Sequence, residues 1–118
     1  MVKDYYKVKK LGVIFTDSRC TPLRQGVSGV GMSHWGFKGI KNHIGRKDLF
    51  GRKIEMSTTN VVDCLASAAV LVMGESNESC PLAIVNDFEG IEFQDKVDSK
   101  ELFIEKERDI FLPLFERK

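Results

Sequence analysis

The chain has 118 residues, of which 42% are hydrophobic and 30% are charged, and 18 basic and 17 acidic residues leave a net charge of +1. We expect one domain spanning residues 1–118, and a compact chain of this size buries about two-thirds of its unfolded surface. The balanced charge gives no reason to expect nucleic acid as a partner, and no apolar run is long enough to predict a membrane span.

The three cysteines are widely spaced and form no C-x-x-C pair. This argues against a disulfide framework or a zinc site and favours a reducing compartment. The first residues do not show the pattern of a secretory signal, so we expect a cytoplasmic protein. Cys64 falls in an apolar stretch and is expected to be a small buried hydrophobic residue.

The first predicted element is a buried strand over Leu11–Thr16 that ends at Asp17. Ser18 follows at once, and Arg24 comes soon after. A carboxylate and a hydroxyl can hold Mg²⁺ or Mn²⁺, and an arginine can bind phosphate or carboxylate. The alternative is an ordinary turn in which Asp17 and Ser18 bond to nearby backbone groups.

Seven of the ten glycines lie between Gly26 and Gly51. Their alternation predicts a thin strand over Gly26–Ser33, suited to close approach by another backbone or a ligand. No phosphate-loop pattern accompanies it. We expect a short helix over His34–Ile44 and a turn over Lys47–Arg52.

Lys53–Thr58 alternates apolar and polar residues and predicts a strand. A long helix should follow, capped by Thr59 or Asn60 and ended by Gly74. Its predicted apolar face holds residues at helical spacing, namely Val61, Leu65, Ala68 and Val72.

The loop after this helix is rich in side-chain oxygens. It could supply a metal ligand and contacts to a nucleotide, or it could be a solvated connection. Its candidate residues are Met73, Gly74, Glu75, Ser76, Asn77, Glu78 and Ser79.

Further along we expect a strand over Leu82–Val85, a short hairpin strand over Ile91–Phe93, and a short helix ending near Pro113 that docks on a partner surface. The predicted fold class is therefore α+β, with a mixed or antiparallel sheet, one long helix and one or two short helices.

Several segments together resemble the carboxy-terminal half of the γ-glutamyl ligase family typified by the coenzyme F420 ligase. The resemblance is strongest over residues 11–87. It rests on the order and spacing of Thr16-Asp17-Ser18, Pro22-Leu23-Arg24, Gly26-Val27-Ser28-Gly29-Val30, Asp48-Leu49-Phe50-Gly51-Arg52, Val62–Ala69, Val72-Met73-Gly74-Glu75 and Pro81-Leu82-Ala83-Ile84-Val85.

The resemblance implies a reaction in which GTP activates a carboxylate and the amine of glutamate then attacks it. By position, Asp17 would hold a first metal ion, the hydroxyl of Ser18 a second, and Glu75 would be a further ligand of Mg²⁺ or Mn²⁺. Met73–Ser79 would line the nucleotide. Arg24 would neutralise a phosphate or a substrate carboxylate and is the candidate catalytic residue.

The sequence also departs from the family's pattern. Cys20-Thr21 replaces the Gly-Arg of the F420 enzymes, so the acceptor could be a deazaflavin, a folate-like or another small molecule. Family proteins are longer, and their amino-terminal half carries another nucleotide loop. We therefore expect the isolated chain to be inactive. We expect that an amino-terminal half is missing or is supplied by a separate subunit, and that the chain forms a homodimer. The alternative is a non-catalytic remnant that acts as an oligomerisation or protein-interaction module.

Overall fold

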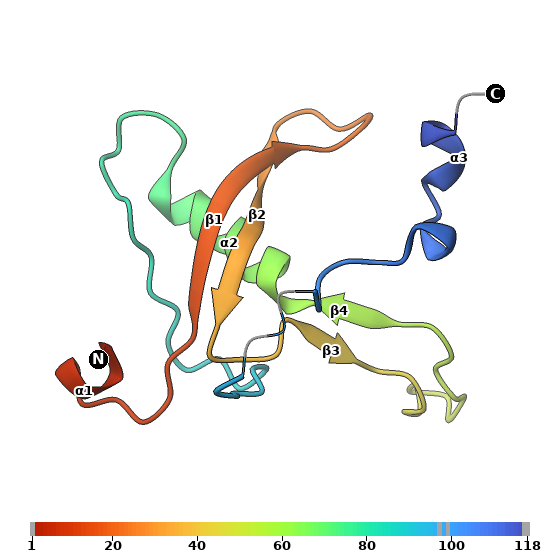
Figure 1. Ribbon diagram of the computed structural model, residues 1–118, viewed down its shortest axis with the longest axis horizontal. Helices are drawn as coiled ribbons and strands as arrows, with labels where there is room; N and C mark the ends of the chain where they lie inside the picture. The colour runs from red at the N-terminus through yellow and green to blue at the C-terminus, as the bar shows by residue number, and fades with distance from the viewer. Residues whose placement is uncertain (1, 97, 99, 117–118) are drawn as a thin grey trace.

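The computed structural model describes residues 2–96, 98 and 100–116. They form an α+β fold with two separate two-stranded antiparallel sheets and one long helix, which confirms the predicted class (Figure 1). No helix in the described part is long and apolar enough to cross a membrane. The elements in chain order are α1 (Val2–Tyr5), β1 (Val13–Cys20), β2 (Val27–Trp35), β3 (Ile40–Asn42), β4 (Thr58–Asn60), α2 (Val61–Met73), the 3-10 turn η1 (Lys106–Arg108) and α3 (Leu112–Phe115).

β1 and β2 form a long antiparallel hairpin, with one register shift between Phe15 and Thr16. The predicted glycine-rich strand over Gly26–Ser33 is confirmed as β2. The prediction that the first strand ends at Asp17 is wrong, because pairing with β2 carries β1 on to Cys20.

The long helix α2 packs across β2 (Figure 1). A Cβ atom at Gly29 would overlap the backbone carbonyl of Ala66, and one at Gly31 would overlap the side chain of Val62. The absent side chains therefore let the helix approach the strand closely. Because Val62 lies over Gly31 and Ala66 over Gly29, α2 runs antiparallel to β2 and toward the β1–β2 loop.

Both ends of α2 lie where the sequence predicts them. Asn60 is the N-cap, and its side-chain oxygen accepts a hydrogen bond from the backbone N–H of Asp63 at 3.0 Å. Gly74 follows the last turn with a φ of +81°, and its N–H donates to the carbonyl of Val70. Local capping signals therefore set the length of the helix.

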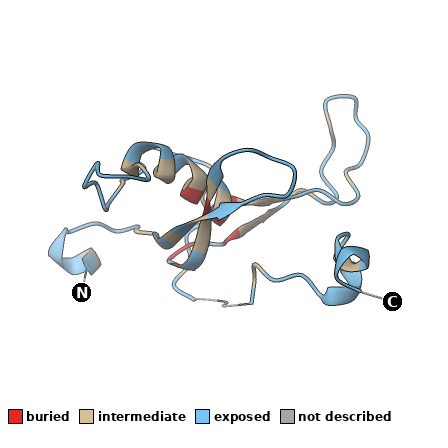
Figure 2. Ribbon diagram, turned by 90° about the horizontal axis from the view of Figure 1, so that it is seen from above, coloured by how far each residue is buried: buried red, intermediate tan, exposed pale blue. Residues whose placement is uncertain are grey.

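The core is small and lies where α2 meets the end of β2 (Figure 2). Leu65 packs against it, but Ala68 and Val72 of the predicted apolar face are exposed, and so is Cys64. These expectations were wrong because the helix turns a different side toward the glycines of β2. The buried hydrophobic residues in the described part are Phe37, Val61, Val62 and Ala66.

The chain exposes far more surface than its mass requires. Its accessible surface is 10576 Å², whereas a compact monomer of 13.3 kDa exposes about 6,500 Å². The expected burial of about two-thirds of the unfolded surface is therefore wrong. Figure 2 shows why, because most of the ribbon outside the contact between α2 and the hairpin is pale blue.

Two predicted elements between β2 and α2 are wrong. In place of a helix over His34–Ile44, β2 continues to Trp35 and the short strand β3 follows. Gly36 has a φ of +90°, which interrupts any right-handed helical path there. The strand expected over Lys53–Thr58 lies slightly later, as β4 paired with β3. The turn over Lys47–Arg52 is confirmed.

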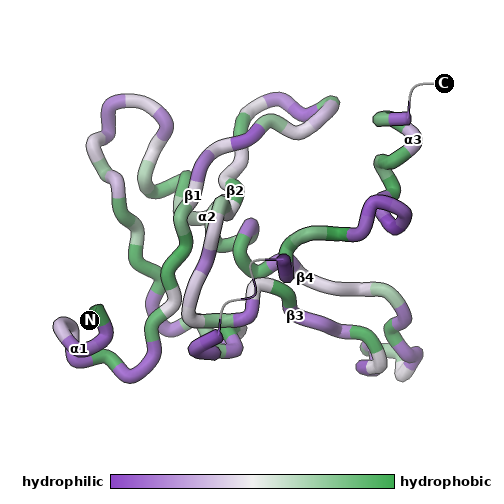
Figure 3. The backbone as a smooth tube through the Cα atoms, viewed as in Figure 1, coloured by the Kyte–Doolittle hydropathy of each residue, from purple (hydrophilic) through white to green (hydrophobic). Residues whose placement is uncertain are grey.

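The last third of the chain has little regular structure. Leu82–Val85 forms no strand, and Phe93 pairs with Phe37 and not with that segment. The final helix does not end near Pro113 but begins there, since proline is tolerated in a first turn. Figure 3 shows hydrophobic stretches in the segment after α2 and near the C-terminus, although neither α3 nor η1 buries a residue.

Candidate functional site

Asp17 lies in the middle of β1, opposite Val30 of β2. The residue is exposed, and its Oδ1 accepts a hydrogen bond from the backbone N–H of Ser18 at 2.7 Å. Within the described residues its carboxylate makes no ion pair. Most of its hydrogen-bonding capacity is therefore open to solvent.

Asp17 and Ser18 lie on opposite faces of the hairpin, because neighbouring residues of a strand alternate. Ser18 lies opposite Gly29, and Gly29 faces α2. Ser18 is accordingly half-buried on the inner, helix-covered face, whereas Asp17 belongs to the outer face.

The chain offers oxygen ligands for a hard cation but does not assemble a full set of them. The described residues contain no group of three or more His, Cys, Asp or Glu side chains that could hold a metal ion. Asp17 and Ser18 also point to different faces of one strand. A divalent cation at either residue would need further ligands from outside the described part of the chain.

The loop after α2 folds around the side chain of Glu78. The Oε2 atom of Glu78 accepts a hydrogen bond from the backbone N–H of Ser76 at 2.8 Å. Hydrogen bonds from the backbone N–H of Glu78 itself and from that of Ser76 hold the pKa of this carboxyl below its usual value of 4.5. Glu75 and Asn77 are exposed and extend the polar surface of the loop.

Arg24 lies in the loop that joins β1 to β2, where its backbone N–H donates to the carbonyl of Thr21 at 3.2 Å. Leu23, beside it, has a φ of +59°. Because α2 runs toward this loop, Arg24 and the loop over Met73–Ser79 lie toward the same end of the hairpin (Figure 1). Asp17 lies farther back along β1.

A comparison with protein families identifies the chain. The family model described as F420-0:Gamma-glutamyl ligase matches residues 3–87. This chain belongs to that family. The match includes β1, β2, α2 and the loop after α2, which are the elements that carry the predicted site.

Curated relatives support the same family assignment. This chain is 41% identical to the coenzyme F420:L-glutamate ligase of Methanococcus maripaludis (strain C7) over 103 residues, which cover 87% of this chain and 41% of that protein. The protein of the same name from Archaeoglobus fulgidus is 35% identical over 86% of this chain and 40% of its own length. The one from Haloarcula marismortui is 39% identical over 83% and 37%. The chain therefore spans about two-fifths of the length of these relatives.

One carboxylate of this family member joins helix and strand in a way that the sequence analysis missed. Asp63 Oδ1 accepts the backbone N–H of Gly31 at 2.9 Å, and Oδ2 accepts from the side-chain amide of Asn60 at 2.9 Å. The guanidinium of Arg19 lies 3.4 Å from the same carboxylate. The spacing Asn60-x-x-Asp63 signals the helix start, but nothing local reveals the contact with β2.

A second carboxylate, Glu101, ties the late part of the chain to the core. It accepts the backbone N–H groups of Gly39 at 2.9 Å and Ile40 at 3.2 Å. His34, which is 8% exposed, has its Nε2 3.4 Å from Glu101 Oε2. That contact does not have hydrogen-bond geometry, so it attracts only when the imidazole is protonated. Sequence reasoning had no signal for a pair 67 positions apart.

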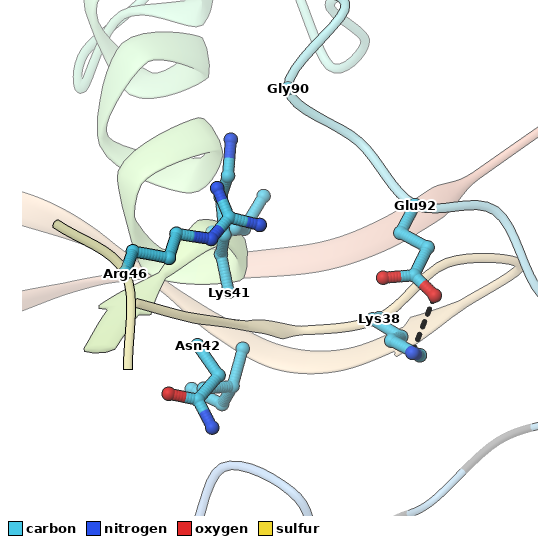
Figure 4. A pocket seen from close by; sticks show the side chains of 8 residues that line it. Lys38, Lys41, Asn42, Arg46, Gly90 and Glu92 are labelled. Atoms are coloured by element: carbon cyan, nitrogen blue, oxygen red, sulfur yellow. Dashed lines mark ion pairs between the residues drawn. The ribbon is translucent and has the colours of Figure 1, made fainter. Parts of the chain in front are cut away.

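A hollow lined by basic residues lies beside β3, away from the predicted site. Its volume is about 180 Å³. Lys38 and Glu92 form an ion pair across one side of it (Figure 4). The lining residues are Lys38, Ile40, Lys41, Asn42, Arg46, Val61, Gly90 and Glu92.

Proposed function

We propose that this chain is part of a GTP- and divalent-metal-dependent γ-glutamyl ligase that joins an acceptor carboxylate to the amine of L-glutamate. The observation that carries the proposal is the 41% identity to a coenzyme F420:L-glutamate ligase over 87% of this chain. The γ-phosphoryl group of GTP would pass to the carboxylate and form an acyl phosphate and GDP. The amine would then attack the acyl carbon and form the C–N bond, while the C–O bond to phosphate breaks and the amine gives up a proton.

The chain's own residues would take distinct parts in this reaction. The carboxylate of Asp17 and the hydroxyl of Ser18 lie on opposite faces of β1 and would serve two separate ions of Mg²⁺ or Mn²⁺, and Glu75 would supply a further oxygen ligand. Such ions neutralise phosphate charge during transfer. The exposed loop over Met73–Ser79 would contact the nucleotide, and Arg24 would neutralise a phosphate or a substrate carboxylate.

We further propose that another polypeptide completes the site on the outer face of the hairpin. Asp17 lies on that face, which also exposes large apolar side chains, including Phe15 at 73% and Val13 at 49%. Exposed apolar surface of this kind marks an interaction site. The excess of accessible surface over a compact monomer also supports a partner that covers part of this chain.

The test uses the full chain, alone and coexpressed with the part of the Methanococcus maripaludis relative that it does not match. We expect GTP with Mn²⁺ to raise the melting temperature of the coexpressed pair, and glutamate to be joined to the acceptor only there. Asp17→Ala should abolish both effects. Asp98→Ala is the matched control, because Asp98 is also exposed and its side chain, within the described residues, also bonds only a nearby backbone N–H. Nucleotide stabilisation that survives Asp17→Ala would refute the assigned role.

One observation favours the second candidate, an oligomerisation or interaction module. The C-terminal segment exposes Phe103 at 80%, Ile110 at 83% and Phe115 at 75%. Sedimentation of the full chain should then show a homodimer, and a double variant with Ile110→Ser and Phe115→Ser should be monomeric. A chain that is monomeric at all concentrations would count against self-association and leave only docking on a different protein.

A further inference from the structure

The hollow beside β3 lies at the opposite end of α2 from the proposed nucleotide loop. Val61, the first residue of the helix, lines the hollow, whereas Met73 at the other end opens into the loop. A helix of 13 residues separates its ends by about 18 Å. A group bound in the hollow would therefore occupy a second site, independent of the proposed role of the loop.

The lining of this hollow carries two cations in excess. Glu92 is paired with Lys38, both through their side chains and through a backbone hydrogen bond of 2.8 Å. Lys41 and Arg46 make no ion pair within the described residues. The whole chain has a net charge of only +1, so this excess is a local feature and does not follow from composition.

The backbone around both free cations is fixed by hydrogen bonds. Lys41 lies in β3, paired with Thr59 of β4. Arg46 closes a turn in which its N–H donates to His43 at 3.1 Å and its carbonyl accepts from Ile54 at 2.8 Å. Figure 4 shows Lys41 and Arg46 extending to the same side of the β3 backbone. Arg46 is exposed and Lys41 half-buried, so water screens their mutual repulsion, and an anion that lies near both would be attracted by both.

We propose that this hollow binds a small oxyanion, held by Lys41 and Arg46. The guanidinium fork matches two oxygens of a phosphate or carboxylate group, and the ammonium adds a compact charge. A volume of about 180 Å³ is below the range of about 300–1,000 Å³ that holds drug-sized ligands, so the hollow fits one anionic group and not a whole nucleotide. Ile40 and Val61 also line the hollow, which favours an anion with a short carbon chain as well as free phosphate.

The experiment titrates the full ¹⁵N-labelled chain with inorganic phosphate and, separately, with glutarate, while sodium chloride holds the ionic strength constant. Amide shifts report where each anion binds. The test variant is Lys41→Gln with Arg46→Gln, and Arg46→Gln alone serves if the double variant does not fold. The matched control is Lys9→Gln with Arg108→Gln, which removes the same charges from exposed positions outside the hollow.

We expect saturable shifts at Lys41, Asn42 and Arg46, and affinity in the test variant to fall by about tenfold or more, because charge-assisted hydrogen bonds are lost. The control should bind as the unmodified chain does. Tighter binding of phosphate assigns the site to phosphate groups, and tighter binding of glutarate assigns it to carboxylates. Shifts that do not saturate, equal loss in the control, or full binding by the test variant would each overturn the proposal.

Discussion

The two faces of the β1–β2 hairpin are built very differently. The inner face carries glycines and small polar residues, and α2 covers it so closely that Gly29 and Gly31 have no room for a side chain. The outer face carries Phe15, Val13 and Asp17, all of which are exposed. The inner face is buried by α2 of the same chain, whereas the outer face has the composition of a surface that is buried in a larger assembly.

This difference separates residues that hold the fold from residues proposed to act in chemistry. Asp63 faces the hairpin from α2, and its carboxylate accepts hydrogen bonds from Gly31 of β2 and from the helix cap Asn60. Among the described residues, the side chain of Asp17 has only a local bond to Ser18 and is otherwise exposed. An aspartate that satisfies backbone donors stabilises the structure, whereas an open one remains available to a ligand.

The largest effect is expected where the inner face allows no added atom. Gly29→Val should destabilise the chain by about 3 kcal/mol, because the new side chain meets the backbone of Ala66 and must displace α2. Ser28→Val, one residue earlier and on the outer face, should change the free energy of unfolding by no more than about 0.5 kcal/mol. Urea denaturation measures both, and equal losses would contradict the contrast between the faces.

A smaller effect should distinguish the two aspartates. Asp63→Ala leaves the N–H of Gly31 without its acceptor and removes the bond to Asn60, which should cost about 2 kcal/mol of stability. Asp17→Ala should cost less than about 0.5 kcal/mol, since its carboxylate is exposed. The same denaturation series compares them. A loss for Asp17→Ala as large as that for Asp63→Ala would show that Asp17 is a structural residue.

The sequence predicts the parts of the fold that are encoded locally. Asn60 and Gly74 mark the ends of α2 because capping depends on residues next to the helix. The glycines of β2 predict a thin strand and a close neighbour. Pairings between distant segments, such as that of Phe37 with Phe93, depend on packing and have no local signature, so the expected strand over Leu82–Val85 and its hairpin were wrong.

The candidate site likewise has some features that the sequence encodes locally and others that depend on packing between distant segments. Strand alternation alone could have placed Asp17 and Ser18 on opposite faces. Which face α2 covers follows only from the contacts of Gly29 and Gly31. The hollow with Lys41 and Arg46 combines β3, a turn, the start of α2 and the segment near Glu92, so no single stretch of sequence announces it.

The smallest expected effect concerns the loop after α2, which belongs to neither face. Backbone N–H groups of Glu78 and Ser76 stabilise the charged form of the Glu78 carboxyl, so its pKa in the folded chain lies below the usual 4.5. The contribution of this loop conformation is therefore present above the unfolded pKa and is lost as the pH falls through the lower folded value.

Nuclear magnetic resonance should detect this as a titration of the Ser76 amide with a midpoint below 4.5. The titration should vanish in Glu78→Gln, which keeps the size of the side chain and removes its charge. A midpoint at or above 4.5 would show that the loop does not hold the carboxylate in solution. The loop would then be open along its length, with Glu78 as free as Glu75 to meet a nucleotide or a cation.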